Sequence, residues 1–396
     1  MIARADGRIL LVSGAIPGER VLARVERVAK GVVYAETTDV EEASADRRTA
    51  PADPLCGGCL FNHIAYPRQL DIKSQIIADA FARIGRLELP APVRVAPSPE
   101  EGYRMRARLH VRGHRLGFFR EGTHDLCEAR QTRQLLPSTC DALDRLAAAL
   151  RSLGLEGVRE LELAENLDAS DRVVYLDSLQ ASDGPALSRM GTSDGLTGLA
   201  SAYGVSGRLH VTDRIDLGDT SVSLQRHVLA FFQGNRHLLT ALVSHVVGLV
   251  PVGGALVDLY AGVGLFSVSA AVARGARVTA VEGDRVAAAD LAVNAAACGG
   301  AVTVVQQAVE VYAAGAQPAA DTVVVDPPRT GLSREAMDGL LRLNPSRLVY
   351  VSCDVATLAR DGRRIADAGY RIDRADAFDL FPNTPHVETV IVFGRG

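Results

Sequence analysis

The sequence predicts an α/β protein whose last part, residues 231–396, is built around a mostly parallel β-sheet. Two observations predict this fold. From Phe231 onward, short apolar segments typical of strands alternate with segments that have helical spacing, and this alternation is typical of a parallel sheet covered on both faces. Before Phe231, strand-like segments separated by Gly and Pro predominate, which predicts β-rich structure upstream.

Length and composition are those of an ordinary folded chain. The 396 residues suffice for two or three domains, and 47% hydrophobic with 23% charged residues exclude overall disorder. Without an apolar run of 18 residues or a signal-peptide pattern, we expect a cytoplasmic protein that does not enter a membrane. The net charge of −4 excludes a uniformly basic surface, and Lys30 and Lys73 are the only lysines among 43 basic residues. Six cysteines in so long a chain do not predict a disulfide framework.

The first 230 residues are expected to form two units. Short β segments suggest a small barrel of the OB type over residues 1–48. Residues 49–230 begin with a loop around Cys56 and Cys59 and then read as a β-rich unit. The segments behind this prediction are strands at 7–14, 18–25 and 30–35, a helix over 70–84, a Pro-rich connector at 90–99, mostly strands over 103–229, and a helix near 141–153.

The C-terminal part carries the alternating pattern. The expected strands are 255–260, 278–282, 302–306, 322–326, 348–352, 372–378 and 387–393. The expected helices are one that ends at 273, and 286–297, 334–343 and 357–368. Ligands of such sheets bind at the carboxyl ends of the strands, and four motifs of this sequence fall at those ends.

The first motif follows the strand that starts at Ala255 and contains Gly262 and Gly264. Glycines there let the backbone approach a ligand, and Glu282, at the end of the next strand, can accept both hydroxyls of a ribose. The third glycine of NAD-binding proteins would fall at Ser267, so NAD is disfavoured relative to S-adenosylmethionine. The alternative is a plain turn between a strand and a helix.

The other three motifs bring reactive side chains to strand ends. In DPPR at 326–329, Arg329 stands where amine methyltransferases have an aromatic residue, so amine methylation is disfavoured, and a rigid Pro-Pro loop is the alternative. Cys353 ends a strand and opens onto a loop, which places it to react, although free cysteines are more often buried fillers. Glu388 begins the last apolar strand, where an acid is costly unless it is solvated or used.

Together these motifs resemble those of the RNA uracil-5-methyltransferases, which make 5-methyluridine in 23S rRNA and in the T-loop of tRNA. The family motifs read like DLYCGVGLFS, DPPRxGL, YVSCxxxTLARD and FPxTxHVE. Their counterparts here are DLYAGVGLFS at 258–267, DPPRTGL at 326–332, YVSCDVATLARD at 350–361 and FPNTPHVE at 381–388. Further resemblances are FFQGN at 231–235, similar to the family's FFQxN, and segments 14–21 and 31–48, similar to its RNA-binding TRAM domain.

The resemblance implies a Rossmann-like, seven-stranded class I methyltransferase domain at 231–396, an OB-like TRAM barrel at 1–48 and a β-rich, RNA-binding central domain at 49–230. It also implies S-adenosylmethionine as the cofactor. The residues that would bind this cofactor are Gln233, Tyr260, Gly262, Gly264, Glu282 and Asp326. Phe231 would stack on the target base, and Arg329 would also contact the substrate.

The resemblance further implies covalent catalysis by Cys353 and Glu388. Carbon 5 of uracil is too weak a nucleophile to attack a sulfonium methyl group directly, and a Cys353 thiolate that adds to carbon 6 makes carbon 5 enolate-like. Glu388 matches the general base that removes the proton from carbon 5 before the thiol leaves. The target base must be flipped out of its helix or loop to reach Cys353.

The cysteines depart from the family pattern. Members with a [4Fe–4S] cluster have C-x5-C-G-G-C and a later fourth cysteine, and here only Cys56 and Cys59 match. The first ligand position falls on Ala50 and the fourth on Thr132. Cubane clusters generally need four thiolates, so we expect no cluster and interpret the pair as a remnant. The alternative is a zinc or iron site completed by other residues, namely Cys127 or Cys140 with His63.

RNA contact is expected at an arginine-rich strand. Over residues 104–112 basic residues alternate with others, and the period of two places them on one face of a strand. These residues are Arg104, Arg106, Arg108, His110 and Arg112. Four arginines on one face are more than a solvated strand usually shows, although a solvated face is the alternative. Arg106 and Arg108 are the RNA contacts we expect.

The sequence as a whole predicts an RNA 5-methyluridine methyltransferase with structured RNA as its partner and no obligate protein partner. We expect 23S rRNA, because the TRAM-like N-terminus resembles the rRNA branch more than the compact bacterial tRNA branch. The T-loop of tRNA is the alternative. An RNA-binding relative without catalysis is disfavoured by the intact Cys353 and Glu388. A small-molecule methyltransferase is disfavoured by the two large N-terminal regions and the arginine strand.

Overall fold

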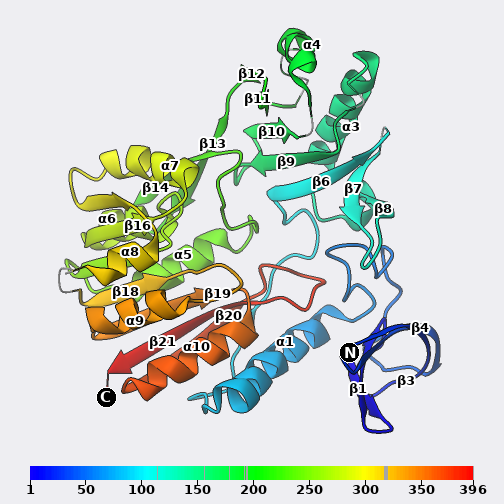
Figure 1. Ribbon diagram of the computed structural model, residues 1–396, viewed down its shortest axis with the longest axis horizontal. Coiled ribbons are helices and arrows are strands. Elements are labelled where there is room, and N and C mark those ends of the chain that lie inside the picture. The colour runs from blue at the N-terminus through cyan, green and yellow to red at the C-terminus, as the bar shows by residue number, and fades with distance from the viewer. Residues whose placement is uncertain are drawn as a thin grey trace.

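The computed structural model describes residues 1–113, 115–155, 157–177, 179–190, 192, 195–315 and 320–395. Within this part of the chain there are three larger β-sheets and a two-stranded hairpin, joined by helices and loops (Figure 1). In Figure 1 the N-terminal sheet lies at the lower right, the central sheet above it, and the C-terminal sheet on the left. The order along the chain agrees with the sequence prediction, because β-rich structure comes first and alternating strands and helices come last.

The N-terminal sheet has four strands in the order β1-β2-β4-β3. β2 and β4 are parallel, and the other neighbours are antiparallel. The strand pairings within the described residues do not join β1 to β3, so the closed barrel stays a prediction. The strands are β1 (Ile2–Ala5), β2 (Arg8–Ser13), β3 (Arg20–Ala29) and β4 (Val32–Glu42).

The central sheet has seven strands in the order β12-β11-β10-β9-β6-β7-β8. Its core forms where Leu143 and Leu146 of α3 pack on Leu109, Leu161 and Leu163 of the strands. The strands are β6 (Arg106–Arg112), β7 (Arg115–Phe119), β8 (Leu126–Glu128), β9 (Glu160–Glu165), β10 (Arg172–Leu176), β11 (Gly198–Ser201) and β12 (Gly204–Gly207). The helices are α2 (Ala129–Thr132), α3 (Pro137–Ser152), the 3-10 turn η2 (Ala181–Asp183) and α4 (Gly184–Met190).

The C-terminal sheet has eight strands in the order β17-β16-β15-β18-β19-β21-β20-β5. β21 is antiparallel to both of its neighbours, and the other pairs are parallel. The sheet is one strand wider than the predicted seven, because β5 (Val95–Ala96) covers the otherwise unpaired edge of β20. The other strands are β15 (Ala255–Leu259), β16 (Arg277–Glu282), β17 (Val302–Gln306), β18 (Thr322–Val325), β19 (Arg347–Ser352), β20 (Tyr370–Phe378) and β21 (Glu388–Arg395).

Helices cover both faces of this sheet, as the alternating pattern predicts (Figure 1). Successive residues of a strand pack into separate cores on the two faces of the sheet. Val324 packs with α5, α6 and α7, whereas Val323 packs with α8, α9 and α10. The helices are α5 (Leu239–Gly248), α6 (Leu265–Arg274), α7 (Arg285–Ala296), α8 (Val309–Ala314), α9 (Arg334–Leu343) and α10 (Val355–Asp367). The sequence prediction did not include α5 and α8. Among the described residues, no helix is long and apolar enough to cross a membrane.

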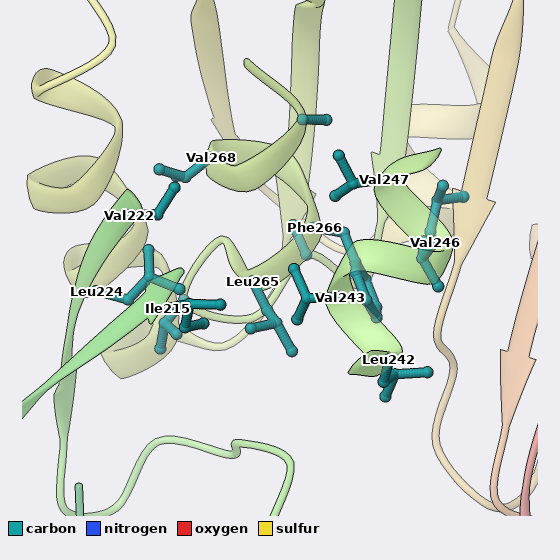
Figure 2. Packing of buried hydrophobic residues seen from close by; sticks show 14 of the residues in the cluster. Ile215, Val222, Leu224, Leu242, Val243, Val246, Val247, Leu265, Phe266 and Val268 are labelled. Atoms are coloured by element: carbon teal, nitrogen blue, oxygen red, sulfur yellow. The ribbon is translucent and has the colours of Figure 1, made fainter. Parts of the chain in front are cut away.

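A β-hairpin upstream of residue 231 belongs to the C-terminal core by its packing. Its strands, β13 (His210–Asp216) and β14 (Ser221–His227), alternate buried and exposed residues and therefore have one apolar face. In Figure 2 the side chains of Ile215, Val222 and Leu224 from this face lie near α6. The predicted boundary at residue 231 therefore cuts through a packed core.

The helix predicted over 70–84 is α1 (Tyr66–Ala80), which continues into a π-helical turn, η1 (Phe81–Gly85). Pro67 lies in the first turn, where a missing N–H breaks no helical hydrogen bond. Ile77 and Phe81 share a core with α10, and α1 runs beside α10 in Figure 1. Although α1 and β5 fall within the predicted 49–230 unit, both pack on the C-terminal sheet.

Candidate active site

The four motifs meet at one edge of the C-terminal sheet. The parallel strands β15, β18 and β19 end at this edge, and β21, which runs the other way, begins there. With residues 229–234 they border a cleft of about 710 Å³. The lining residues are Tyr103, Arg104, Arg106, Leu229, Phe231, Phe232, Gln233, Gly234, Tyr260, Gly262, Glu282, Asp284, Ala287, Asp326, Pro327, Pro328, Arg329, Cys353, Leu380, Phe381 and Glu388.

Twelve residues are expected to act in catalysis, cofactor binding, base stacking or RNA contact, and all but two of them line this cleft. Gly264 does not line it. It has a φ of +98°, and a Cβ there would lie 2.8 Å from side-chain atoms of Leu291 and Val268. Glycine is thus required for the close packing at the start of α6. Arg108 also lies outside the cleft, where its exposed side chain is paired with Glu162 at 2.7 Å.

The side of the cleft next to β15 and β16 presents a carboxylate and main-chain amides. Glu282 accepts hydrogen bonds from the N–H groups of Gly262 and Asp284, each at 2.7 Å. Tyr260, the first residue after β15, has a φ of +62°, which is unusual for a residue with a side chain. Such a turn brings the backbone and one acid to the same point, where an adenosine ligand can be held.

A second pair of side chains connects the FFQGN segment to the DPPR motif. Gln233 donates a hydrogen bond to Asp326 at 3.1 Å. Burial raises the pKa of Asp326 to about 7, against the opposing effect of that hydrogen bond. Behind it, the Ser267 hydroxyl donates to the fully buried Asp258, whose pKa burial also raises to about 7. Ser267 therefore has a structural use at the position where NAD-binding proteins have glycine.

Cys353 stands at the end of β19, just before Asp354 caps the start of α10 by accepting from the Thr357 N–H at 2.8 Å. The thiol is half-buried. Burial raises its pKa to about 11, the neighbouring Glu388 adds to this rise, and Arg329 opposes it through a hydrogen bond and its charge. Arg329 is thus the side chain of the DPPR motif that favours a thiolate at Cys353.

Glu388 is 1% exposed, and neither of its carboxylate oxygens has a hydrogen-bond partner within the described residues. Burial raises its pKa well above the usual value, and Asp326 adds to the rise while Arg329 opposes it. A buried carboxylate without a partner is costly, so this acid is poised to take a proton or a hydrogen bond from a bound molecule.

The arginine strand has the predicted alternation. Met105, Ala107, Leu109 and Val111 are buried, and the basic residues between them point away from that core. Arg106 differs from Arg108 because it lines the cleft, where its guanidinium lies 5.8 Å from the centre of the Phe231 ring. Acids on β9 oppose this face, since both arginines pair with Glu162.

Several cleft residues were not selected by the sequence analysis. Phe232 and Phe381 lie inside motifs of the family resemblance, which was a usable signal. Arg104 was named in the sequence analysis as part of the arginine strand, but its contact with the cleft, like that of Tyr103, is tertiary. The start of the arginine strand bridges to Asn235 of the FFQGN segment. No local pattern could have indicated that bridge.

The cysteines differ from the prediction, because Cys56 and Cys127 form a disulfide across 71 residues. The loop before Cys59 lies along β7 and β8: the Gly57 N–H donates to the Phe119 carbonyl at 3.0 Å. This contact brings Cys56 beside Cys127. The remaining residues of the alternative metal site lie elsewhere, since Cys140 packs in the central core and His63 Nε2 faces the Ala15 carbonyl at 3.5 Å.

Comparison with known proteins shows which family the chain belongs to. Residues 205–395 match a family model described as tRNA (Uracil-5-)-methyltransferase. The 23S rRNA (uracil(1939)-C(5))-methyltransferase RlmD of Acidithiobacillus ferrooxidans is 33% identical over 425 residues, which cover 100% of this chain and 94% of the relative. The chain belongs to the RNA uracil-C5-methyltransferase family. RlmD of Pseudomonas putida is 32% identical, with 100% of this chain and 91% of the relative covered.

A solved structure of an RNA uracil-C5-methyltransferase has the same fold over nearly the whole chain. It is the tRNA (uracil-54, C5)-methyltransferase of Pyrococcus abyssi in complex with S-adenosyl-L-homocysteine, at 26% identity and a TM-score of 0.76, with 97% of this chain and 94% of that chain covered. As a family member, this protein is an S-adenosylmethionine-dependent RNA methyltransferase. The recognition of the family from the four motifs is confirmed.

The donor set of this family member does not fit a four-thiolate cluster. One of the two matching cysteines, Cys56, is in a disulfide, and Cys59 is a buried thiol beside it. The hydroxyl of Thr132, at the fourth ligand position, donates to the Ala129 carbonyl at 2.8 Å. The disulfide joins the loop that contains Cys56 to β8 of the central sheet, which contains Cys127.

We predict that protein purified without oxygen and denatured without reductant shows four titratable thiols and no stoichiometric iron. The reason is that four of the six cysteines are free, and the other two are joined. A thiol titration and an iron assay make the measurement. Cys127→Ser should release the Cys56 thiol and give five, whereas Cys298→Ser should give three. Six thiols in the native sequence, or stoichiometric iron and sulfide, would contradict the disulfide.

Proposed function

We propose that this protein transfers a methyl group from S-adenosylmethionine to carbon 5 of a uridine in 23S rRNA, with Cys353 and Glu388 as catalytic residues. The observation that carries the proposal is that the thiol, the unpartnered acid and the Gln233–Asp326 pair border one cleft. Relatives whose names give 23S rRNA as their substrate match over the whole chain. We propose the cytoplasm as its compartment, since rRNA is made there in bacteria.

The proposed reaction begins at Cys353. Its thiolate adds to carbon 6 of the uracil, and the resulting enolate carries its electron pair at carbon 5. Bound S-adenosylmethionine supplies an electrophilic methyl group, and carbon 5 displaces S-adenosylhomocysteine from it. Glu388 then takes the proton from carbon 5, and the bond between carbon 6 and the Cys353 sulfur breaks. The thiolate is regenerated, and the methylated uracil leaves.

Burial suits Glu388 to this step. A carboxylate that is out of water and unpartnered is a stronger base than a solvated one, because its neutral form is favoured. General-base help of this kind is typically worth about 10²–10⁴-fold in rate. For the cofactor we propose Glu282 as the ribose contact, and Gln233, Tyr260, Gly262 and Asp326 as the other lining residues.

The target base would enter from the arginine-rich side. Phe231, at 61% exposure, offers an open ring for stacking, and Arg106 and Arg329 bring positive charge to the mouth of the cleft. We propose the face of β6 and the N-terminal TRAM-like sheet as the surfaces that hold the surrounding RNA. This arrangement requires the uridine to be flipped out.

A uridine in the T-loop of tRNA is the second candidate substrate. The likeness to the Pyrococcus abyssi tRNA enzyme over 97% of this chain favours it. Both candidates use the same cleft and the same chemistry, so they differ in which RNA delivers its uridine.

We predict that the protein forms a covalent adduct with a 5-fluorouridine-containing fragment of 23S rRNA in the presence of S-adenosylmethionine. Fluorine cannot leave as a proton does, so the bond to Cys353 persists and the complex is visible on a denaturing gel. Cys353→Ala should abolish the adduct, whereas Cys298→Ala, a thiol outside the cleft, should not. An equally substituted tRNA is the comparison: an adduct with tRNA alone would contradict 23S rRNA, and none with either RNA would contradict the mechanism.

We predict that adduct formation at saturating RNA speeds up about tenfold per pH unit from pH 7 to 9. The pKa of the Cys353 thiol is about 11, so the thiolate fraction rises with pH throughout this range. Single-turnover kinetics measure the rate of adduct formation at each pH. The affinity for S-adenosylmethionine is measured over the same range as the control. Arg329→Met should slow the reaction, because it removes the charge that opposes the raised pKa, and Arg329→Lys should restore part of the rate. A flat profile would show that thiolate formation does not limit the step.

We predict that Arg106→Ala and Arg108→Ala both weaken RNA binding, and that S-adenosylmethionine binding stays unchanged. Each variant lacks one cation, and the slope of log affinity against log salt should fall by about 0.7–0.9 for each phosphate that the variant no longer binds. Arg106→Ala should have the larger effect on adduct formation, because Arg106 lines the cleft. Filter binding at several salt concentrations measures this. The matched control is Arg214→Ala, an exposed arginine on β13, and equal weakening in all three variants would contradict a local RNA surface.

A further inference from the structure

The loop between β20 and β21 forms one wall of the cleft. It contains Leu380 and Phe381, which line the cleft, and it leads directly into Glu388. Asn235 of the FFQGN segment holds its main chain from one side, donating to the Leu380 carbonyl at 3.2 Å. The position of this loop therefore decides where two cleft residues and the proposed base lie.

The other side of the loop is held by Lys73 of α1. Its ammonium is fully buried, pairs with Asp379, which is also fully buried, and donates to the Phe381 carbonyl at 2.9 Å. The Tyr66 hydroxyl donates to the second oxygen of Asp379 at 3.0 Å. Burial lowers the pKa of Lys73, and Asp379 opposes this effect. A buried lysine is tolerated only with such partners. Lys73 therefore keeps its bonds to Asp379 and the Phe381 carbonyl, and these bonds hold the loop in one place.

Composition sets Lys73 apart. The chain has two lysines among 43 basic residues, and the other one, Lys30, lies exposed in the turn between β3 and β4. Arginine presents a planar fork, whereas an ammonium is a compact charge with donors in three directions. Here one ammonium serves a carboxylate and a main-chain carbonyl in a site closed to water, which suits lysine and does not suit arginine.

A second contact on the same face of α1 strengthens the hold. Gln69 and Asn383 bind reciprocally: Gln69 Nε2 donates to Asn383 Oδ1 at 2.9 Å, and the Asn383 N–H donates to Gln69 Oε1 at 3.0 Å. Tyr66, Gln69 and Lys73 share this face, because residues three, four and seven apart lie on one side of a helix. The loop is thus bound by a helix that lies far upstream in the sequence.

We propose that Lys73 is a positioning residue for methyl transfer. By holding Asp379 and the Phe381 carbonyl, it fixes the wall that presses the target base toward Cys353, and it fixes the start of β21 that carries Glu388. This inference rests on the covalent mechanism proposed above. It assigns α1 a role in the reaction although α1 does not line the cleft.

The test separates positioning from plain stabilisation. Lys73→Met leaves Asp379 buried without its cation, so it is compared with the double variant Lys73→Met/Asp379→Asn, in which both charges are gone. Arg214→Met, which removes an exposed cation on β13 outside the cleft and outside the proposed RNA surfaces, is the control. For the full-length protein, melting temperature, S-adenosylmethionine affinity and the rate of adduct formation with the 5-fluorouridine RNA are measured, together with turnover of the unsubstituted RNA.

We expect the double variant to melt near the native temperature and to bind S-adenosylmethionine within about twofold of the native protein, because α1 does not touch the cofactor side of the cleft. Adduct formation should still fall about tenfold to a hundredfold, since a small misplacement of reacting groups costs that much. Arg214→Met should match the native protein. A native rate in the double variant, or loss of cofactor binding in parallel with activity, would overturn the proposal. Should the native protein form no adduct, the covalent mechanism fails, and turnover of unsubstituted RNA still decides whether Lys73 positions the wall.

Discussion

The antiparallel pairing of β21 with β19 is the constraint on which the active site depends. Ser352 lies opposite Thr389 in this pairing, so the residue after one and the residue before the other meet at the same edge of the sheet. These residues are Cys353 and Glu388. Because side chains alternate along a strand, a shift of one residue in register would turn Glu388 to the other face of the sheet. A thiol and an acid far apart in sequence thus share a cleft through one strand pairing.

Asp326 and Glu388 are two of the acids that line the cleft, and the fully buried Asp258 lies near Asp326. Asp326 and Asp258 have pKa values raised to about 7 by burial, and the pKa of Glu388 is raised as well. Three such groups close together would repel one another if all were charged, and Arg329 is the cation that acts on both Glu388 and the Cys353 thiol. Burial thus favours the neutral form of each of these acids, which makes each carboxylate a stronger base than a solvated one.

A net charge of −4 is compatible with an RNA-modifying enzyme because the charges are arranged locally. Much of the arginine on the central sheet is paired with acids, as Arg108 is with Glu162 and Arg115 with Glu128. The arginines that border the cleft are Arg104, Arg106 and Arg329. Composition reports the sum over the whole surface, whereas attraction for RNA depends on how cations are grouped locally.

Local patterns in the chain were enough to predict most of the order of strands and helices in the C-terminal part, and to recognise the family. Most of the residues chosen from the motifs also border the cleft in the structure. Periodicity and motifs involve neighbours in sequence, so they can be read without knowledge of the fold. The folded arrangement alone reveals that β5 joins the edge of β20, that the β13–β14 hairpin packs on α6, and that Cys56 bonds to Cys127. It alone also brings Lys73 to Asp379 across 306 residues. Contacts at such separations follow from how apolar faces and sheet edges find their partners in the folded chain, and no local pattern carries that information.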